Sequence, residues 1–380
     1  MTEDKRTLTD YFSATWPLLI TMSEDEQERS IQTKRVFRDF LGLHDCQVRT
    51  EAYATNNFKY QYTLSDFITL RCDGPLNKDG ERTCQLEMKG EGCREFERLA
   101  KDKGITWLDL FNLLIGMNAS FKRFDLANDD KSGLEMNQNY FYDKLKKGEY
   151  TSTFKSPPKF YGFSEDSVNI ELGGRRSPTQ LVVYDKRREQ LEKNHKCDES
   201  YWTRYELRFR GAKADAAILD LCKNYKDNTD LVNGVDLNKF AKVQLRNTID
   251  LKVSNNDDSN HNYRNETDPK YLAFLDNIEK GEKIKVEQRE TNYESRRAYA
   301  MPRASQVIAT WYAMKNRDMD LFIHDFLKEM YTLLSKYTDK QKKRLNENLI
   351  DNGIEPLSEE EFDKFKLEFL DKAYDMELPF

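Results

Sequence analysis

Polar and apolar residues alternate with a period of two through much of the first 210 residues. The segment 8–20 mixes β-branched and aromatic residues and predicts an opening strand, and short alternating runs over 47–88 predict further strands. Turn residues at Gly74-Pro75 and Asp79-Gly80 separate those runs. The first part of the chain is therefore expected to form a meander of antiparallel strands.

Later stretches show the same period and assign side chains to faces. In 121–130, Phe124 and Leu126 fall on one face, and Arg123 and Asp125 fall on the other. Two strands are expected in 150–172 and one in 201–210, and their polar faces would carry Asn169, Glu171, Arg204, Glu206, Arg208 and Arg210.

Apolar residues spaced three and four apart predict helices between and after the strands. The predicted helices are 94–103, 106–117, 137–147, several over 211–246, 269–280 and most of 292–372. Ser358 and Glu361 form a capping box before the last one. The polar segment 255–267 is the expected domain boundary. We therefore predict an α+β fold with a curved antiparallel sheet flanked by helices over 1–254, followed by a mostly helical region over 255–380.

Composition excludes several classes of protein. Charged residues make up 34% of the 380 residues, and the mean hydropathy is -0.86. There is no apolar run of about 18 residues and no signal peptide at the polar N-terminus, so neither a membrane span nor secretion is expected. The six cysteines include no Cys-x-x-Cys pair and are expected to be reduced thiols of a cytoplasmic protein.

The distribution of charge is more informative than its total. The net charge of -6 disfavours a nucleic-acid partner at first sight. However, residues 301–380 hold 12 basic and 16 acidic residues, whereas residues 173–210 hold 10 basic and 6 acidic ones. A local basic region of this kind can bind DNA even on an acidic protein.

The basic region includes the stretch LGGRRSPTQLVVYDKRREQ at 172–190. Its Gly-Gly turn lets the backbone approach a ligand closely, and the β-prone run that follows brings Tyr184 next to Lys186. Neighbouring cations favour phenolate over phenol and neutralise a phosphodiester, so Tyr184 is a candidate nucleophile towards phosphate. The alternative is an edge strand whose tyrosine is packed and whose basic residues are solvated.

Four predicted strands place charged residues on one polar face. The acidic residues among them are Asp125, Glu171 and Glu206, mostly close to arginines. Two or three converging carboxylates are suitable ligands for Mg²⁺ or Mn²⁺, which would polarise a phosphodiester for in-line attack. Arginines would bind the remaining phosphate oxygens. The alternative is the solvent-exposed face of an ordinary antiparallel sheet.

Other chemistries find little support in the sequence. The four histidines are scattered without a His-x-His pair, which excludes the histidine-ligated metal of HUH nickases and the spacing of zinc hydrolases. The chain has no Walker A motif and no Gly-x-Gly-x-x-Gly motif, so binding of ATP or a dinucleotide is unsupported.

Four motifs follow one another in order: LEMKGEGCR at 86–94, RFDLANDD at 123–130, the stretch at 172–190, and RYELRFRG at 204–211. Together they resemble the Rep_trans rolling-circle replication initiators of small plasmids from low-GC Gram-positive bacteria. The resemblance spans about residues 8–290. The same nuclease core is shared by MobT-type relaxases of integrative conjugative elements.

The resemblance implies a metal-dependent, site-specific DNA endonuclease and strand transferase that acts on a plasmid double-strand origin, at a hairpin with a single-stranded loop. Tyrosine attack would leave a covalent 5′-phosphotyrosine and free a 3′-OH primer, and the strand would later be rejoined. Tyr184 matches the family's nucleophile, and Arg187 stands where some members have a second tyrosine. Asp125 and Glu206 match the family's acidic metal positions, and Glu171 is a further candidate ligand of Mg²⁺ or Mn²⁺. With the residues of the polar face, the expected catalytic residues are Tyr184, Lys186 and Arg123.

The resemblance also implies partners. Region 1–254 would be the DNA-nicking domain, and 255–380 would serve origin recognition, in the stretch 262–274, and interaction. A homodimer is expected, and the helices after about 300 suggest dimerisation or contact with a host helicase. The expected DNA-binding residues are Arg175, Arg176, Ser177, Arg187, Arg188, Arg204, Arg208 and Arg264.

Two alternatives stay open. A MobT-type relaxase would use the same chemistry at a transfer origin, although such relaxases often carry an N-terminal helix-turn-helix and this chain starts on its first predicted strand. A non-nicking regulator would bind an origin irrespective of Tyr184 and of divalent metal.

Overall fold

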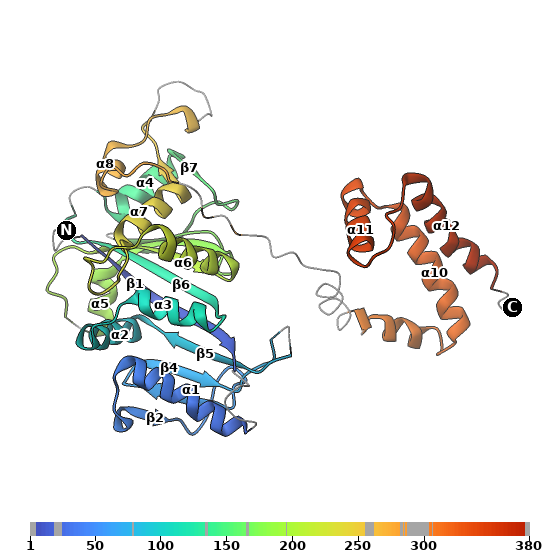
Figure 1. The fold of residues 1–380 in the computed structure, drawn as a ribbon. Helices are drawn as coiled ribbons and strands as arrows, with labels where there is room; N and C mark the ends of the chain where they lie inside the picture. The colour runs from blue at the N-terminus through green and yellow to red at the C-terminus, as the bar shows by residue number, and fades with distance from the viewer. Residues whose placement is uncertain are drawn as a thin grey trace. The chain divides into compact units, whose positions relative to one another are not determined.

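Two compact units make up the chain, one up to Glu287 and one from Gln288 (Figure 1). Each unit is considered by itself. The computed structural model describes residues 5–18, 25–77, 80–133, 136–164, 167–194, 196–254, 262–281, 284, 286, 304–305 and 307–376.

A large antiparallel sheet organises the first unit. In the described residues it has ten strands in the order β2-β3-β4-β5-β1-β6-β11-β10-β9-β8. The strands are β1 (Lys5–Pro17), β2 (Val48–Thr50), β3 (Tyr60–Leu64), β4 (Ile68–Cys72), β5 (Thr83–Met88), β6 (Ser120–Asp130), β8 (Lys159–Ser164), β9 (Ser167–Leu172), β10 (Thr179–Asp185) and β11 (Thr203–Arg210). A small second sheet pairs β7 (Tyr150–Ser152) with β12 (Ile249–Leu251).

Helices pack on the apolar side of this sheet. Helices α3, α4, α6 and α7 contact strands between β1 and β9 in the sheet order, α1 contacts β3 and β4, and α2 contacts β1, β4 and β5 (Figure 1). The apolar face of the central strands carries fully buried side chains, among them Phe12, Phe124 and Leu207. The helices of this unit are α1 (Glu26–Leu41), α2 (Gly90–Lys103), α3 (Trp107–Gly116), α4 (Gln138–Lys146), α5 (Lys186–Asn194), α6 (Ala212–Asn224), α7 (Leu237–Thr248) and α8 (Pro269–Phe274).

The predicted α+β fold is confirmed. The opening strand, the meander, the central strands and most of the predicted helices form close to their predicted positions, but α8 ends at Phe274 instead of residue 280, and α1 was not predicted. Region 150–172 holds three strands instead of two, because β7 turns away to pair with β12. Irregular pairing between β1 and β6 at Thr9/Tyr11 and at Ser13/Ala14 is consistent with the expected curvature, since bulges bend a strand.

The first unit extends beyond the predicted boundary at residue 254. Of the polar segment 255–267, residues 255–261 lie outside the described residues. Lys252 pairs with Thr267 in a β-bridge, Tyr271 and Phe274 are buried in the core, and the Lys144 ammonium lies 2.8 Å from the Asp268 carboxylate. These contacts join the chain up to α8 to the sheet domain.

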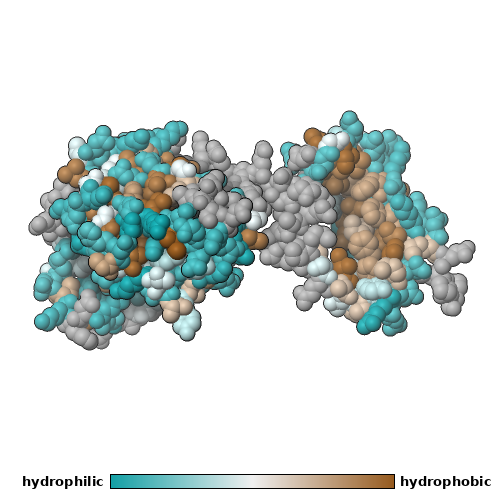
Figure 2. Space-filling model, turned by 60° about the horizontal axis from the view of Figure 1, so that its bottom comes forward, coloured by the Kyte–Doolittle hydropathy of each residue, from teal (hydrophilic) through white to brown (hydrophobic). Residues whose placement is uncertain are grey.

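The second unit is helical, as predicted. Its helices include α10 (Met319–Ser335), α11 (Asp339–Asp351) and α12 (Glu359–Tyr374), and the Ser358/Glu361 capping box is present. The predicted helical segment 292–303 lies outside the described residues. Figure 2 shows a band of apolar side chains bordered by hydrophilic ones on this unit.

The state of the cysteines and the apolarity of the helices bear on two expectations from the composition. All six cysteines are free thiols, as expected. Within the described part of the chain, no helix combines the length and the apolarity that crossing a membrane requires.

Candidate active site

The polar face of the sheet gathers most of the residues that the sequence singles out. Strands β6, β11 and β10 are neighbours, and side chains two residues apart on a strand point to the same face. The rows that cross this face are Asp129–Arg204–Tyr184, Ala127–Glu206–Val182 and Asp125–Arg208–Gln180. The predicted polar face therefore exists, and it brings together a tyrosine, acidic residues and arginines.

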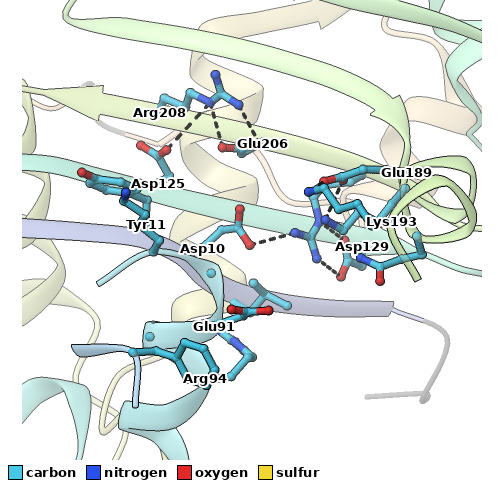
Figure 3. Close-up of a pocket in the computed structure, with 18 of the residues that line it drawn as sticks. Asp10, Tyr11, Glu91, Arg94, Asp125, Asp129, Glu189, Lys193, Glu206 and Arg208 are labelled. Carbon is cyan, nitrogen blue, oxygen red and sulfur yellow. Dashed lines mark hydrogen bonds and ion pairs between the residues drawn. The ribbon is translucent and has the colours of Figure 1, made fainter. Parts of the chain in front are cut away.

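These side chains line a cavity of about 990 Å³, called the central cavity below (Figure 3). The start of α2 and the helix α5 contribute to its walls. Its lining includes ten basic and seven acidic side chains, and this excess of positive charge suits a polyanion. The predicted site residues that line it are Arg123, Asp125, Tyr184, Lys186, Arg204, Glu206 and Arg208.

Arg204 joins three strands through buried ion pairs. Its Nε and Nη2 donate to the two carboxylate oxygens of Asp129 at 2.6 and 2.8 Å, and its Nη1 donates to Asp10 at 2.8 Å. Figure 3 shows Asp10 pointing from β1 towards this guanidinium. Only 4% of Arg204 is exposed, so its geometry favours a positioning role over the predicted contact with DNA.

Asp125 and Glu206 are the acidic residues nearest the centre of the face, where each is bound by an arginine. The Nε of Arg123 donates to both oxygens of Asp125 at 3.0 and 2.9 Å. Arg208 donates to Glu206 at 2.7 and 2.9 Å and lies 3.8 Å from Asp125 (Figure 3). The two carboxylates therefore share one arginine.

Burial and ion pairing act differently on these two carboxyl groups. Burial raises the pKa of Asp125 above its usual value, despite the neighbouring Arg123. Burial also acts to raise the pKa of Glu206, but the hydrogen bonds and charge of Arg208 outweigh it and lower that pKa. Glu206 is therefore the group that stays ionised most readily.

The surroundings of Tyr184 differ from the sequence-based expectation. The ring is partly buried in the row with Arg204, and the Lys186 ammonium lies 5.8 Å from its centre. Lys186 is itself paired with Glu189 at 2.6 Å. Burial, followed by the negative charge of Glu206, raises the pKa of Tyr184 instead of lowering it. Tyr184 is therefore a phenol, and its proton must leave during any attack.

Glu171 lies apart from the other two predicted metal ligands. Glu171 pairs in register with Val182 of β10, and Val182 pairs with Glu206 of β11. The backbones at the two glutamates are therefore about 10 Å apart, with β10 between them. Glu171 lines a second hollow of about 890 Å³, called the edge cavity below, which extends from Tyr184 towards β8. Arg175, Arg188 and Arg208 also line it.

The remaining predicted DNA-binding residues line neither cavity. Ser177 closes the turn at 174–177 by accepting a hydrogen bond from the Gly174 amide at 2.9 Å, and Arg176 is exposed on that turn. Arg187 donates to the Glu199 carbonyl at 2.9 Å. Arg264 is exposed and stacks over Tyr263 in a short 3₁₀ turn.

A divalent metal fits two of the three predicted ligands. No group of three or more His, Cys, Asp or Glu side chains suited to holding a metal occurs among the described residues, so Asp125, Glu206 and Glu171 do not form one cluster. Mg²⁺ is often held by only one or two carboxylates together with water and substrate phosphates. Asp125 and Glu206, diagonal neighbours that share Arg208, fit such an ion.

Several residues of the central cavity were not predicted. Tyr11 on β1 donates a short hydrogen bond to Glu87 on β5 and lies under the Arg123 guanidinium, whose carbon is 4.1 Å from the ring centre. Asp129 continues the alternation of Asp125 and could have been found from it. Asp10 lies at the irregularity between Thr9 and Tyr11, which no feature of the sequence marks.

Known proteins resemble this chain in sequence and in fold. The protein NicK of Bacillus subtilis (strain 168), to which a DNA relaxase activity is ascribed, is 36% identical over 176 residues, which make up 43% of this chain and 47% of NicK. The match thus spans about half of that relative. A solved structure of the rolling circle replication initiator protein from Geobacillus stearothermophilus has a TM-score of 0.56 at 22% identity, over 72% of this chain and 96% of that one. It has the same fold.

Family profiles cover most of the sheet domain and reach into the helical unit. The profile of the rolling-circle replication initiation protein N-terminal domain matches residues 29–113. The profile of the replication initiation factor family, Rep_trans, matches residues 119–331, which is more than half of the chain and includes every strand of the polar face from β6 to β11. The protein therefore belongs to the family of rolling-circle replication initiators.

Proposed function

We propose that this protein binds a replication origin and nicks one DNA strand with Tyr184 as the nucleophile. The observation that carries the proposal is the row Asp129–Arg204–Tyr184 beside Glu206 and Asp125, inside a cavity with an excess of positive charge. The Tyr184 oxygen would form a bond to the scissile phosphorus while the bond to the 3′ oxygen breaks. The product is a 5′-phosphotyrosine and a free 3′-OH, and the reverse reaction rejoins the strand.

The side chains around Tyr184 would remove the phenol proton and protonate the leaving 3′ oxygen in this step. Because burial raises the pKa of Tyr184, the phenol needs a base as it attacks. Three carboxylates that line the central cavity, Glu206, Glu189 and Asp10, exert their negative charge on the Tyr184 phenol. We assign the proton to Asp10, which is not one of the proposed metal ligands, and Lys186 would protonate the leaving 3′ oxygen.

Asp125 and Glu206 would hold Mg²⁺ or Mn²⁺. Such an ion polarises a phosphodiester oxygen and neutralises charge that develops in the transition state. Arg123 and Arg208 retain 30% and 23% side-chain exposure, so both can turn from the carboxylates to the phosphate oxygens of bound DNA. The arginines would then act as forked phosphate clamps.

The DNA substrate that we propose is a plasmid double-strand origin, extruded as a hairpin with a single-stranded loop. A transfer origin is the second candidate, favoured by the 36% identity to NicK, to which a DNA relaxase activity is ascribed. The two functions share the chemistry and differ in the DNA. Mapping the nick to a plasmid replication origin or to a site beside transfer genes distinguishes them.

A covalent-complex assay tests the nucleophile. The protein is incubated with labelled single-stranded oligonucleotides from candidate origins and Mn²⁺, and the products are separated on a denaturing gel. We expect a protein–DNA band that disappears in Tyr184→Phe and in EDTA, and that persists in Tyr53→Phe, a change at an exposed tyrosine outside both cavities. A band that survives Tyr184→Phe would move the nucleophile to Tyr11. Sequence-specific binding without any band would favour a regulator that does not nick.

Protein partners are proposed for the second unit. A band of apolar side chains on its surface (Figure 2) supports contact with another protein, either a second copy or a host helicase in the cytoplasm. Sedimentation of the protein alone and mixed with the helicase of its host separates these two partners.

A further inference from the structure

The edge cavity has a different chemistry from the central cavity. Its charged lining is balanced, with four basic and four acidic side chains, so it has no excess charge to attract a phosphate backbone. Its volume of about 890 Å³ falls in the range of pockets that enclose small organic groups. Tyr184, Glu189 and Arg208 line both cavities, so the two hollows meet at the proposed nucleophile.

Tyr161 gives the edge cavity an aromatic surface. It lies on the outermost strand, β8, next to Asn169 of β9, and 46% of it remains exposed. Its neighbour Phe160 points to the opposite face, where it contacts the Tyr142 ring at 4.8 Å, so the exposed ring belongs to the polar face. A partly exposed aromatic ring at the wall of a hollow is a stacking platform for a nucleic-acid base.

Asn169 and Gly162 complete the hollow beside Tyr161. Asn169 is exposed, and amide side chains bind base edges as both donor and acceptor. Gly162 has φ +67°, which favours glycine, and a β-carbon there would lie 3.4 Å from the Asn169 amide nitrogen. The glycine, suited to this left-handed backbone position, therefore lies directly beside that amide.

The register connects this surface to Tyr184. Val183 pairs with Ile170, so the next residues along the two strands, Tyr184 and Asn169, continue one row in which Tyr161 pairs with Asn169. Tyr161 therefore lies two strands away from Tyr184 in the sheet. The backbones at the two residues are about 10 Å apart across the strands. That span suits a nucleotide next to the phosphate that Tyr184 attacks.

We propose that the edge cavity binds an unpaired DNA base next to the nick, with Tyr161 stacking on the base and Asn169 bonding to its edge. This inference rests on the proposed nicking function and adds a subsite to it. Under this assignment the central cavity holds the phosphates, and the edge cavity contributes to the choice of sequence at the nick.

Equilibrium binding to single-stranded oligonucleotides tests the subsite without requiring cleavage. The full chain is used in a Tyr184→Phe background, with twelve-nucleotide dA, dT or dC oligomers and an abasic backbone of the same length as probes. We expect Tyr161→Ala to weaken binding of at least one base-bearing oligomer about 5-fold or more, and to leave binding of the abasic backbone unchanged. Tyr161→Phe, which keeps the ring, should bind like the parent, and so should Tyr53→Ala.

The outcomes separate this inference from the nicking function. Equal weakening of base-bearing and abasic probes, or no weakening of either, would overturn the base subsite even if Tyr184 forms a covalent complex. Conversely, a selective loss in Tyr161→Ala would support the subsite even if no covalent complex were found with wild-type protein. Thermal unfolding of each variant verifies that the exposed position leaves the fold intact.

Discussion

Arg204 shows how one buried residue can connect three strands of the site. Its three guanidinium nitrogens bind Asp129 and Asp10 from two other strands, and it stands directly opposite Tyr184. An arginine can satisfy two carboxylates at once because its donors form a rigid fork, whereas a lysine ammonium is a single point. Tyr184 thus lies directly beside a buried ion-pair network.

We expect Arg204→Lys to lower the free energy of unfolding by about 3 kcal/mol, because one buried carboxylate loses its partner. Urea unfolding measures the change. Arg176→Lys is the matched control, since Arg176 is exposed and lines neither cavity, and its unfolding should be unchanged. Equal stability of the two variants would show that the network does not hold the strands.

Two glutamates on the same face give a second residue-scale prediction. Glu206 shares Arg208 with Asp125, whereas Glu171 lies across β10. We expect Glu206→Gln to slow nicking about 100-fold, because a neutral amide is a weaker ligand for the divalent ion, while Glu171→Gln retains most of the activity. Single-turnover cleavage rates at saturating Mn²⁺ measure both. A larger loss in Glu171→Gln would return Glu171 to the metal site.

At the scale of elements, periodicity predicted the faces of the strands but not their neighbours. The alternation of Phe124 and Leu126 with Arg123 and Asp125 was enough to define the polar face of β6, and the same reasoning held for β11. The insertion of β1 between β5 and β6 is a long-range pairing that leaves no local signal. Asp10 joins the site only through the irregular pairing of β1, which interrupts the period of two.

The helix α8 is attached to the sheet domain by a carboxylate. Asp268 caps α8 by accepting from the Lys270 and Tyr271 amides, and it also accepts a hydrogen bond from Tyr140 at 2.6 Å. Burial acts to raise the pKa of Asp268, but hydrogen bonds from Lys144 and Tyr140 outweigh it and lower that pKa. The ionised carboxylate is therefore favoured in the folded protein.

This shift predicts a pH-dependent contribution to stability. A carboxyl group whose pKa is lower in the folded state stabilises the fold above its unfolded pKa of about 3.9, and loses that effect as pH falls through the folded value. We expect Asp268→Asn to reduce the melting temperature at pH 7, and the difference from wild type to shrink below about pH 4. Asp66→Asn, on an exposed pair with Arg49, should have little effect at either pH. A difference for Asp268→Asn that is independent of pH would contradict the role of its charge.

At the scale of the whole molecule, the first compact unit extends further along the chain than the sequence suggested. A polar, Asn/Asp-rich segment is typical of a linker, and the predicted boundary was placed there for that reason. The segment is instead followed by α8, whose rings re-enter the core: Phe274 lies 4.6 Å from Tyr205 between ring centres, and the Tyr271 hydroxyl donates to the Ile249 carbonyl at 2.9 Å. Local composition does not reveal such a return of the chain.

Two truncations distinguish these boundaries. The fragment 1–287 keeps Tyr271, Phe274 and Asp268, and we expect it to unfold cooperatively near the melting temperature of the sheet domain in the full chain and to form the covalent complex. The fragment 1–254 lacks two buried aromatic rings, each of which stabilises a core by about 3–5 kcal/mol. Losses of that size approach the whole stability of a domain, so we expect this shorter fragment to be unfolded.

Circular dichroism during heating and the covalent-complex assay measure both fragments. If the fragment 1–254 folded and nicked as well as the fragment 1–287, the boundary would lie where the polar segment begins, and α8 would be peripheral. If the fragment 1–287 failed to fold, the sheet domain would depend on residues of the second unit. If 1–287 alone is active, the helices from α10 to α12 are left for roles other than cleavage, and their apolar band becomes the surface to test for protein partners (Figure 2).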